Sequence, residues 1–481
     1  MFRRRWSGLP EDPVFPADLK GLGYFVDPET DEIRQISAPT YYFNYFMSKN
    51  VRYNDRQRFA FTTAIQEQLL RPRLEGSLGL VRLPLPLGTP TDEPHVPIYV
   101  SPGLKHKRQV VVIFGESEQE LGVIAHRVIG GRGGIDEGSM VSIVRALHGK
   151  KIPETKEVKS EEKHDNDSAG AKVGDDTDDS HEGGKDNDED APGIVLANTG
   201  ELWWWPEGRR GLTARQSQAV PMKSCVHWGR FYDAAVNAIP GNASVDQHVA
   251  CVFGSVLDNP DLVARDAMIQ VVGVADGAVA AGGFLDRNWG HWKDRVGCLA
   301  MLGFGVDVAS LQSEDFRGFL KEKSRLYITC QEPLDTVISG PDGNPNTTIF
   351  TAYGCPILSS GEAFYTEMTL IRAKDSVLSW LDEVYRAGKG YTNPEIEVTF
   401  ADAELEETPP WGNDPDLVGP PATTDAVGRC GAHQGPQGGG GLEIVTREEW
   451  EARMRKEGKE NVPVPDDVYV CDDKNNKEED D

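Results

Sequence analysis

Short, continuously apolar segments recur through the middle of the chain, and they constrain its fold more than any other feature. Six of them have the composition of strands, and they lie at residues 109–115, 193–198, 268–275, 296–303, 325–330 and 355–359. None shows the alternation of apolar and polar residues that marks a half-exposed strand. The sequence therefore predicts strands that are covered on both faces, as in a parallel sheet.

Helical segments separate these strands, at residues 122–147 with a glycine-rich break, 245–257, 277–285, 311–322 and 362–386. Strands that alternate with helices predict an α/β fold, a doubly wound and mostly parallel sheet in a three-layer αβα arrangement. We expect one such domain over residues 72–400. Residues 1–71 are expected to form an N-terminal element that packs on it, with strands at 24–26 and 32–34 and a helix at 54–70.

The negative charge of the chain is concentrated in two segments. The formal net charge is -27, and residues 150–190 alone carry 15 acidic and 7 basic side chains. Residues 401–481 carry 21 acidic and 8 basic side chains. With so few large apolar residues these segments cannot offset the entropy of folding, so we predict a disordered acidic insert at 150–192 and a disordered acidic tail at 401–481. A capping box at Thr446 predicts one short helix near 446–456, either a docking peptide or a solvated helix.

Charge and composition also exclude several classes of protein. An acidic chain repels phosphate backbones, so any contact with RNA is expected to be local or indirect. No apolar run approaches the ~18 residues of a membrane span, and no segment of signal-peptide type follows the basic start of the chain. The seven cysteines form no C-x-x-C pair and are typical of reduced thiols. A nuclear or cytoplasmic protein that is not secreted is expected.

The stretch VVGVADGAVAAGG, residues 271–283, predicts a strand that turns sharply into a helix. In α/β-hydrolases this turn carries the nucleophile in the pattern G-x-S-x-G. Gly273, Ala275 and Gly277 match the pattern everywhere except at the reactive position, which is alanine. A strand that merely ends at glycine is the alternative. The spacing does not fit a dinucleotide-binding loop, and we expect no cofactor.

The other members of a catalytic triad are incomplete. Asp335 follows a predicted strand and could be a relic of the acid, but no histidine occurs between His291 and His433, and Glu362 stands where the base would be expected. Loss of the nucleophile or the base costs about a million-fold in turnover, so no catalytic residues are assigned. Asp276 as the nucleophile would lie one residue away from the elbow position. Single, scattered histidines and unpaired cysteines predict no metal site.

Two surface features are the candidates for binding. Trp203, Trp204 and Trp205 follow a strand at its carboxyl end, and three adjacent side chains of an extended segment cannot all point inward. We expect at least one of these rings to be an exposed anchor for a partner or to be covered by aromatic N-terminal residues. The most basic region of the core lies beside them and contains Arg209, Arg210, Arg215, Lys223, His227 and Arg230. It is expected to contact an acidic partner or an RNA phosphate, or to be a charged face without a ligand.

A glycine-rich segment at residues 130–134 follows the first predicted central strand. It is either a hinge between helices or a loop that binds a small anion through its backbone amides.

Four segments carry a resemblance to a known family, and they are KGLGYFV at 20–26, VIGGRGGI at 128–135, NTGELWWW at 198–205 and PMKS at 221–224. Together they resemble the Arb-two domain of fungal Argonaute-binding proteins over about residues 15–400, apart from the acidic insert. The resemblance implies a degenerate α/β-hydrolase-like module in an Argonaute small-interfering-RNA chaperone complex, with roles in RNA interference, heterochromatin assembly and gene silencing in the nucleus. A similar domain is fused to class II histone deacetylases, but no deacetylase domain is recognisable here.

Three functions follow from these observations. The leading one is a pseudoenzyme, a non-catalytic interaction module with Argonaute and other silencing-complex subunits as partners. The first alternative is an esterase of the α/β-hydrolase type with an unorthodox nucleophile. The second is a small-ligand-binding protein that uses the vestigial hydrolase pocket.

Overall fold

The computed structural model describes residues 8–149, 191–227, 229–343 and 353–395, together with two short strands at 443–446 and 468–471. The chain divides into two units, residues 1–400 and 401–481. All but the last two residues of the predicted acidic insert at 150–192 lie outside the described residues. None of the described helices is long and apolar enough to cross a membrane.

A nine-stranded sheet organises the first unit, with the strand order β12-β13-β11-β10-β9-β5-β6-β4-β3. The six inner strands from β13 to β6 run parallel and are β5 (Gln109–Phe114), β6 (Gly193–Leu196), β9 (Met268–Val274), β10 (Val296–Leu302), β11 (Ser324–Ile328) and β13 (Ile357–Ser359). They correspond one to one to the six strands predicted from the sequence. The predicted α/β fold with a mostly parallel sheet is therefore confirmed.

The remaining strands of the sheet pair antiparallel and complete its two edges. They are β3 (Val81–Leu85) and β4 (Val96–Val100) beyond β6, and β12 (Val337–Ser339) beyond β13. The sequence did not predict β3 and β4 because Pro84 and Pro97 interrupt them, and proline within a run argues against a strand.

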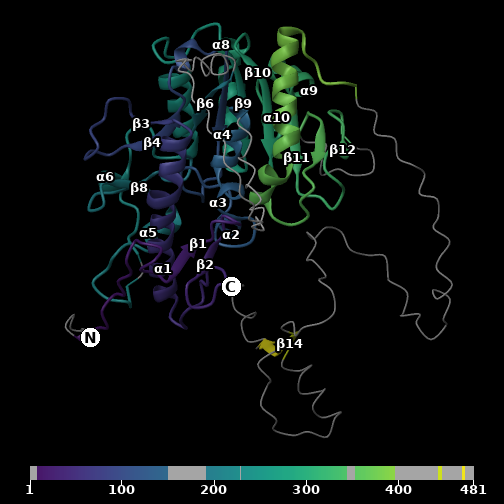
Figure 1. Cartoon of the computed structure of the whole chain (residues 1–481). Coiled ribbons are helices and arrows are strands. Elements are labelled where there is room, and N and C mark those ends of the chain that lie inside the picture. Colours follow the sequence, from purple (N-terminus) through teal and green to yellow (C-terminus); the bar gives the residue numbers. More distant parts are fainter. Residues whose placement is uncertain are drawn as a thin grey trace, which may run out of the picture. The chain divides into compact units, whose positions relative to one another are not determined.

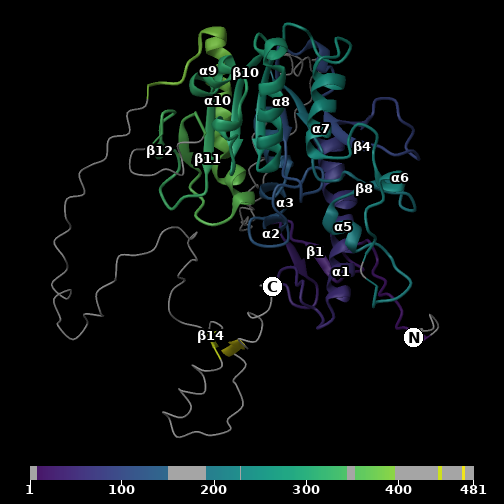
Figure 2. The same ribbon diagram turned by 180° about the vertical axis from the view of Figure 1, so that it is seen from behind.

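Helices cover both faces of the sheet, as the two opposite views of Figures 1 and 2 show. One face is covered by α1 (Val51–Ala64), α4 (Met140–Leu147) and α10 (Thr369–Ala387). The other is covered by α7 (Val245–Cys251), α8 (Asp276–Trp292) and α9 (Glu314–Lys323). Alternate residues of β5 point to opposite faces: Val111 and Ile113 belong to the first apolar cluster and Val112 and Phe114 to the second.

The N-terminal residues pack against the first face. β1 (Tyr24–Val26) and β2 (Ile33–Gln35) form the predicted hairpin, and Tyr24 and Ile33 share an apolar cluster with the sheet. Helix α1 begins three residues earlier than predicted because Asn50, not Asn54, caps it and accepts the Arg52 backbone N–H at 3.0 Å. The helix continues past residue 71, where the sequence indicated a boundary, through the π-helical turns η2 (Ile65–Leu70) and η3 (Pro72–Ser77).

The glycine-rich segment 130–134 joins two short helices, α2 (His126–Ile129) and α3 (Gly134–Glu137). The β1–β2 hairpin packs against this segment. Gly134 has a φ of 77°, and a Cβ there would lie 2.6 Å from the Asp31 carbonyl oxygen. The Gly133 N–H donates to the Glu32 carboxylate at 3.3 Å. The Gly133 amide, one of those expected to be available to an anion, is therefore occupied by a carboxylate of the same chain.

Three helices differ from their predicted bounds. α8 extends to Trp292, whereas the prediction stopped at residue 285. α9 begins at Glu314 because the Ser313 hydroxyl caps it, and α10 begins at Thr369 after the 3-10 turn η8 (Thr366–Met368). In the second unit, β14 (Glu443–Thr446) pairs in parallel with β15 (Val468–Cys471) within the tail that was expected to be disordered. The helix predicted near 446–456 lies, beyond Thr446, outside the described residues.

Candidate functional site

The turn between β9 and α8 has the backbone of a nucleophile elbow. Ala275, which occupies the reactive position, has φ 49° and ψ -118°, a conformation that is unusual for any residue except glycine. Its N–H donates to the Leu302 carbonyl at 2.8 Å, and the side chain is 2% exposed. The strand-to-helix turn is therefore strained as in a hydrolase, but it presents a methyl group.

The two glycines of the pattern are required by close packing. A Cβ on Gly273 would lie 2.3 Å from the Ala278 Cα, and one on Gly277 would lie 2.5 Å from the carbonyl oxygens of Phe114 and Gly115. No side chain fits at such distances. The pattern of small residues thus reflects the contact of this turn with the first turn of α8 and with the end of β5.

The elbow lies where the strand order reverses. β5 and β9 are neighbours, and the chain extends the sheet to one side from β5 through β6 and to the other from β9 through β10. Ligands of open α/β sheets bind outside the carboxyl ends of strands at such a switch point. Asp276 is exposed there and accepts a hydrogen bond from the Ser117 hydroxyl, which follows β5. It lies on the first turn of α8 beside Ala275, not at the elbow position itself.

Asp335, the possible relic of the triad acid, follows β11 as expected but has other partners. Its carboxylate accepts a hydrogen bond from the Ser376 hydroxyl of α10 at 2.5 Å, and Ser376 also contacts the Tyr327 hydroxyl at 3.0 Å. It lines a cavity of about 630 Å³ between β11, β13 and α10, and Ala275 does not line that cavity. The structure gives Asp335 no hydrogen bond or ion pair to the elbow among the described residues.

Glu362, at the position expected for a base, is buried and stabilises a turn. Its carboxylate accepts the backbone N–H groups of Phe364 and Tyr365 at 3.0 and 3.3 Å and lies 3.6 Å from Arg372. A carboxylate that already accepts hydrogen bonds from two backbone amides stabilises the loop after β13.

A cavity of about 410 Å³ at the carboxyl edge was not predicted from the sequence. One wall is aromatic and contains Phe43, Phe59 and Phe61. The other contains Glu116 and Glu120 from the loop after β5, together with the start of α2. The alternating Glu116-x-Glu118-x-Glu120 that follows a buried strand is the signal that could have indicated it, because loops at carboxyl ends of strands hold most sites of this fold class.

The acidic groups of this cavity have shifted pKa values. Burial raises the pKa of Glu116, and the nearby carboxylates of Glu367 and Asp276 raise it further. Burial opposes ionisation of Glu120 as well, but its contact with the His126 imidazole holds the pKa of Glu120 below its usual value. The side-chain oxygens Oε2 of Glu116 and Oε1 of Gln119 are buried without a hydrogen-bond partner among the described residues.

Trp203 and Trp204 are buried and Trp205 is half-buried, so of the two expected arrangements, an exposed anchor or covered rings, these side chains adopt the covered one. All three lie on β7 (Trp203–Trp205), which pairs with β8 (Arg210–Leu212) in a separate hairpin. Trp203 packs with Phe59 and Leu212, and Trp204 packs on the second face of the large sheet. The half-buried Trp205 ring contacts Phe59 edge to face, with 5.9 Å between centroids. Part of this cover comes from Phe59 of α1, an aromatic residue of the N-terminal element.

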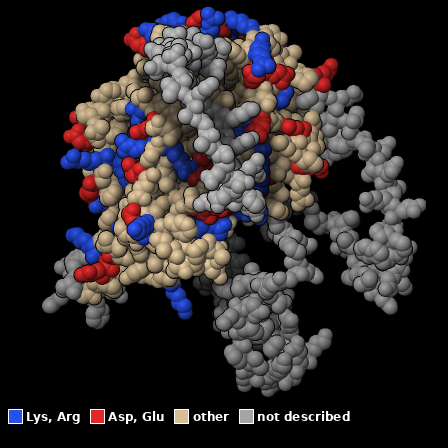
Figure 3. Space-filling model, in the orientation of Figure 1, with Lys and Arg blue, Asp and Glu red and all other residues tan. Residues whose placement is uncertain are grey.

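The predicted basic region is split into three places. Arg209 and Arg210 line a cavity of about 500 Å³, whereas Arg215 lines the 410 Å³ cavity and lies 3.5 Å from Glu118. The third place is a loop that holds Lys223 and His227, with the His227 ring 3.0 Å from the Ser224 hydroxyl. Arg230 lies three residues further along the chain and forms an ion pair with Glu207. In Figure 3, Lys and Arg side chains gather on the side where Figure 1 labels β3, β4 and β8, with carboxylates among them.

No group of three or more histidine, cysteine or acidic side chains among the described residues has the arrangement of a metal site.

One known family model matches most of the first unit of the chain. The model of the Arb2 domain matches residues 15–334, from the segment before β1 to the loop after β11. No curated protein and no solved structure matches the chain significantly. Since the match covers about two thirds of the sequence, the chain belongs to the Arb2 domain family.

Proposed function

We propose that this Arb2-domain chain is a pseudohydrolase, a non-catalytic interaction module that serves as a subunit of an Argonaute small-interfering-RNA chaperone complex. The observation that carries the proposal is the alanine at the elbow: the strained backbone is kept, but Ala275 offers no group that could attack a carbonyl carbon. The family membership supports the choice of partner.

The order of the elements supports descent from an α/β-hydrolase. In that fold the nucleophile, the acid and the histidine follow each other along the chain. Here the elbow follows β9, Asp335 follows β11 and Glu362 follows β13, so all three positions occur in the expected order. Both Asp335 and Glu362 are engaged by neighbouring groups, which argues against the esterase alternative.

The interaction is tested by isolating the tagged full-length chain from its native host under conditions that preserve complexes. We expect an Argonaute protein and further silencing subunits to be recovered, and loss of the chain to impair small-RNA-directed heterochromatin. Recovery of neither an Argonaute protein nor a chromatin-silencing protein would overturn the assignment.

The absence of catalysis is tested with a panel of acyl esters of increasing chain length. We expect turnover at the rate of buffer alone. Turnover that disappears in Asp276→Asn but persists in Asp375→Asn, a substitution at another exposed aspartate, would establish an enzyme with Asp276 in its machinery.

A small-ligand-binding function is the second candidate, and the 410 Å³ cavity favours it. Its volume lies in the range of small-molecule sites, and it combines an aromatic wall with oxygens of Glu116 and Gln119 that have no hydrogen-bond partner in the described part of the chain. Native mass spectrometry of the purified chain would detect a retained ligand. Replacement of Phe61, which lines the cavity, by tryptophan should reduce its occupancy, whereas an empty wild-type protein would remove this candidate.

A further inference from the structure

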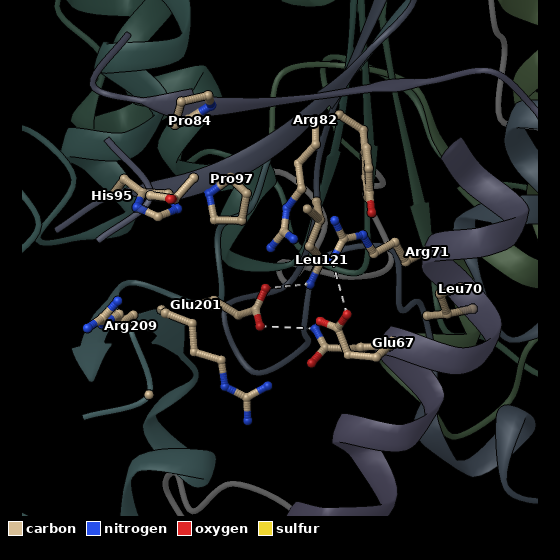
Figure 4. A pocket seen from close by; sticks show the side chains of 16 residues that line it. Glu67, Leu70, Arg71, Arg82, Pro84, His95, Pro97, Leu121, Glu201 and Arg209 are labelled. Atoms are coloured by element: carbon tan, nitrogen blue, oxygen red, sulfur yellow. Dashed lines mark hydrogen bonds and ion pairs between the residues drawn. The ribbon is translucent and has the colours of Figure 1, made fainter. Parts of the chain in front are cut away.

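Four arginines from three separate parts of the chain line the cavity of about 500 Å³ beside the β7–β8 hairpin. Arg71 follows η2, Arg82 lies on β3, and Arg209 and Arg210 lie at the turn from β7 to β8. Figure 4 shows Arg71 and Arg82 extending toward Glu67 and Glu201, with Arg209 on the other side of Glu201. Their convergence concentrates positive charge at one cavity of the first unit.

The two carboxylates of the cavity leave most of this positive charge unpaired. Glu67 forms an ion pair with Arg71 at 3.1 Å. Both oxygens of Glu201 are held by neutral donors, Oε1 by the Gln66 amide at 3.0 Å and Oε2 by the Leu121 N–H and the Asn198 amide at 3.2 and 2.9 Å. Within the described part of the chain, Arg82, Arg209 and Arg210 have no ion pair.

Arg210 is the most constrained of the three. It is half-buried, and its guanidinium donates one hydrogen bond, to the Thr63 hydroxyl at 3.0 Å, while it lies 5.3 and 5.9 Å from the Phe59 and Trp205 ring centroids. Burial lowers the pKa of Arg210, in spite of the carboxylates nearby. A guanidinium has five N–H donors, and a cation that is partly removed from water without a direct ion-pair partner is costly. An anion bound in the cavity would offset this cost.

We propose that this cavity, the arginine pocket, binds a small phosphorylated molecule. Guanidinium groups match phosphate oxygens in a bidentate geometry, which favours arginine at phosphate sites. The volume of about 500 Å³ exceeds the need of a single inorganic ion and fits a ligand with a body attached to its phosphates. Tyr99 and His95 line the same cavity and offer ring surface to that body. The proposal is independent of the elbow and of any Argonaute partner.

The test uses the full chain and calorimetric titration with inorganic phosphate, pyrophosphate and adenosine monophosphate, each at two salt concentrations. We expect saturable 1:1 binding of pyrophosphate or adenosine monophosphate that is tighter than binding of phosphate and weakens with salt. Arg82→Gln and Arg209→Gln remove exposed side chains without ion-pair partners, so both variants should fold, and each should weaken binding about tenfold or more.

Arg265→Gln is the matched control, because Arg265 is also an exposed arginine that forms no ion pair within the described residues, but it lies outside the pocket. Its affinity should equal that of the wild type. The proposal would be overturned if neither organic phosphate nor pyrophosphate bound saturably, or if Arg209→Gln and Arg265→Gln weakened binding equally. It would also fail if a glutamate-rich peptide bound the pocket more tightly than every phosphate compound, since that outcome assigns the site to an acidic protein segment.

Discussion

Ala275 and Arg209 adopt nearly the same unusual φ, 49° and 50°, but the surroundings of the two residues are opposite. Ala275 is buried under the first turn of α8 and presents a methyl group where a reactive one is expected. Arg209 is exposed at the tip of the β7–β8 hairpin and presents a guanidinium to a cavity. Strain is commonly stored at functional sites. The comparison indicates that at the elbow it persists through packing alone, whereas at the hairpin it positions a charge.

The largest change in the free energy of unfolding is expected from a substitution that disrupts the packing of the elbow. Gly277→Ala would place a Cβ 2.5 Å from two carbonyl oxygens, so we expect the free energy of unfolding to fall by about 3 kcal/mol or more, measured by urea denaturation. Gly290→Ala is the control in the same helix, where a Cβ meets no atom within 4 Å, and it should gain about 0.5 to 1 kcal/mol. Equal effects would contradict the packing argument.

The hairpin side of the molecule depends on a buried histidine. The His248 ring accepts the Asn198 N–H at 3.0 Å, and the Asn198 amide in turn holds Glu201 in the arginine pocket. Burial lowers the pKa of His248 to about 3, against an ordinary value of 6.5. Below pH 6.5 the unfolded chain therefore binds a proton that the folded chain does not.

The contribution of His248 to stability is thus complete above pH 6.5 and is lost progressively as the pH falls toward 3. The loss amounts to about 1.4 kcal/mol per pH unit, or about 2 kcal/mol at pH 5. Unfolding titrations between pH 7 and 4 should show a slope that is one proton smaller in His248→Gln than in the wild type. His106→Gln, at an exposed loop position, should leave the slope unchanged. An unchanged slope in both variants would refute the assignment.

Glycine at the elbow should relieve its strain. In Ala275→Gly the loss of a methyl group is offset by a backbone that glycine adopts readily. Ala281→Gly, at a buried helical position with ordinary backbone, has no such compensation. We expect Ala275→Gly to be more stable than Ala281→Gly by about 1.5 kcal/mol in urea denaturation. If the two variants were equally destabilised, Ala275 would carry no strain.

The smallest change in stability is expected at the hairpin. In Arg209→Gly the relief of a positive φ and the extra freedom of the unfolded chain nearly cancel, so the free energy of unfolding should change by less than about 0.5 kcal/mol. Phosphate binding should nevertheless weaken as in Arg209→Gln. A variant that lost stability but kept its affinity would reverse the roles that we assign to the two strained residues.

The central strands could be predicted from the sequence because each is a continuous apolar run. Such a strand is stable mainly in a parallel sheet that is covered on both faces. The turn at Ala275 could be predicted because its glycines have fixed spacing. The edge strands could not, since prolines break their pattern, and the burial of Trp203 and Trp204 depends on α1 and the large sheet, which lie far away in sequence. The arginine pocket was missed as a unit for the same reason: Arg71 and Arg82 lie more than a hundred residues from Arg209.

The position of the connection between α4 and β6 offers a route for protein engineering. It enters the sheet at the amino end of β6, whereas Glu116 and Glu201, which line the two cavities discussed above, follow the carboxyl ends of β5 and β6. The described ends of this connection, Gly149 and Ala191, therefore lie at the edge of the sheet opposite to both sites. A fluorescent reporter or an affinity tag placed there would label the protein while leaving its cavities accessible to ligands.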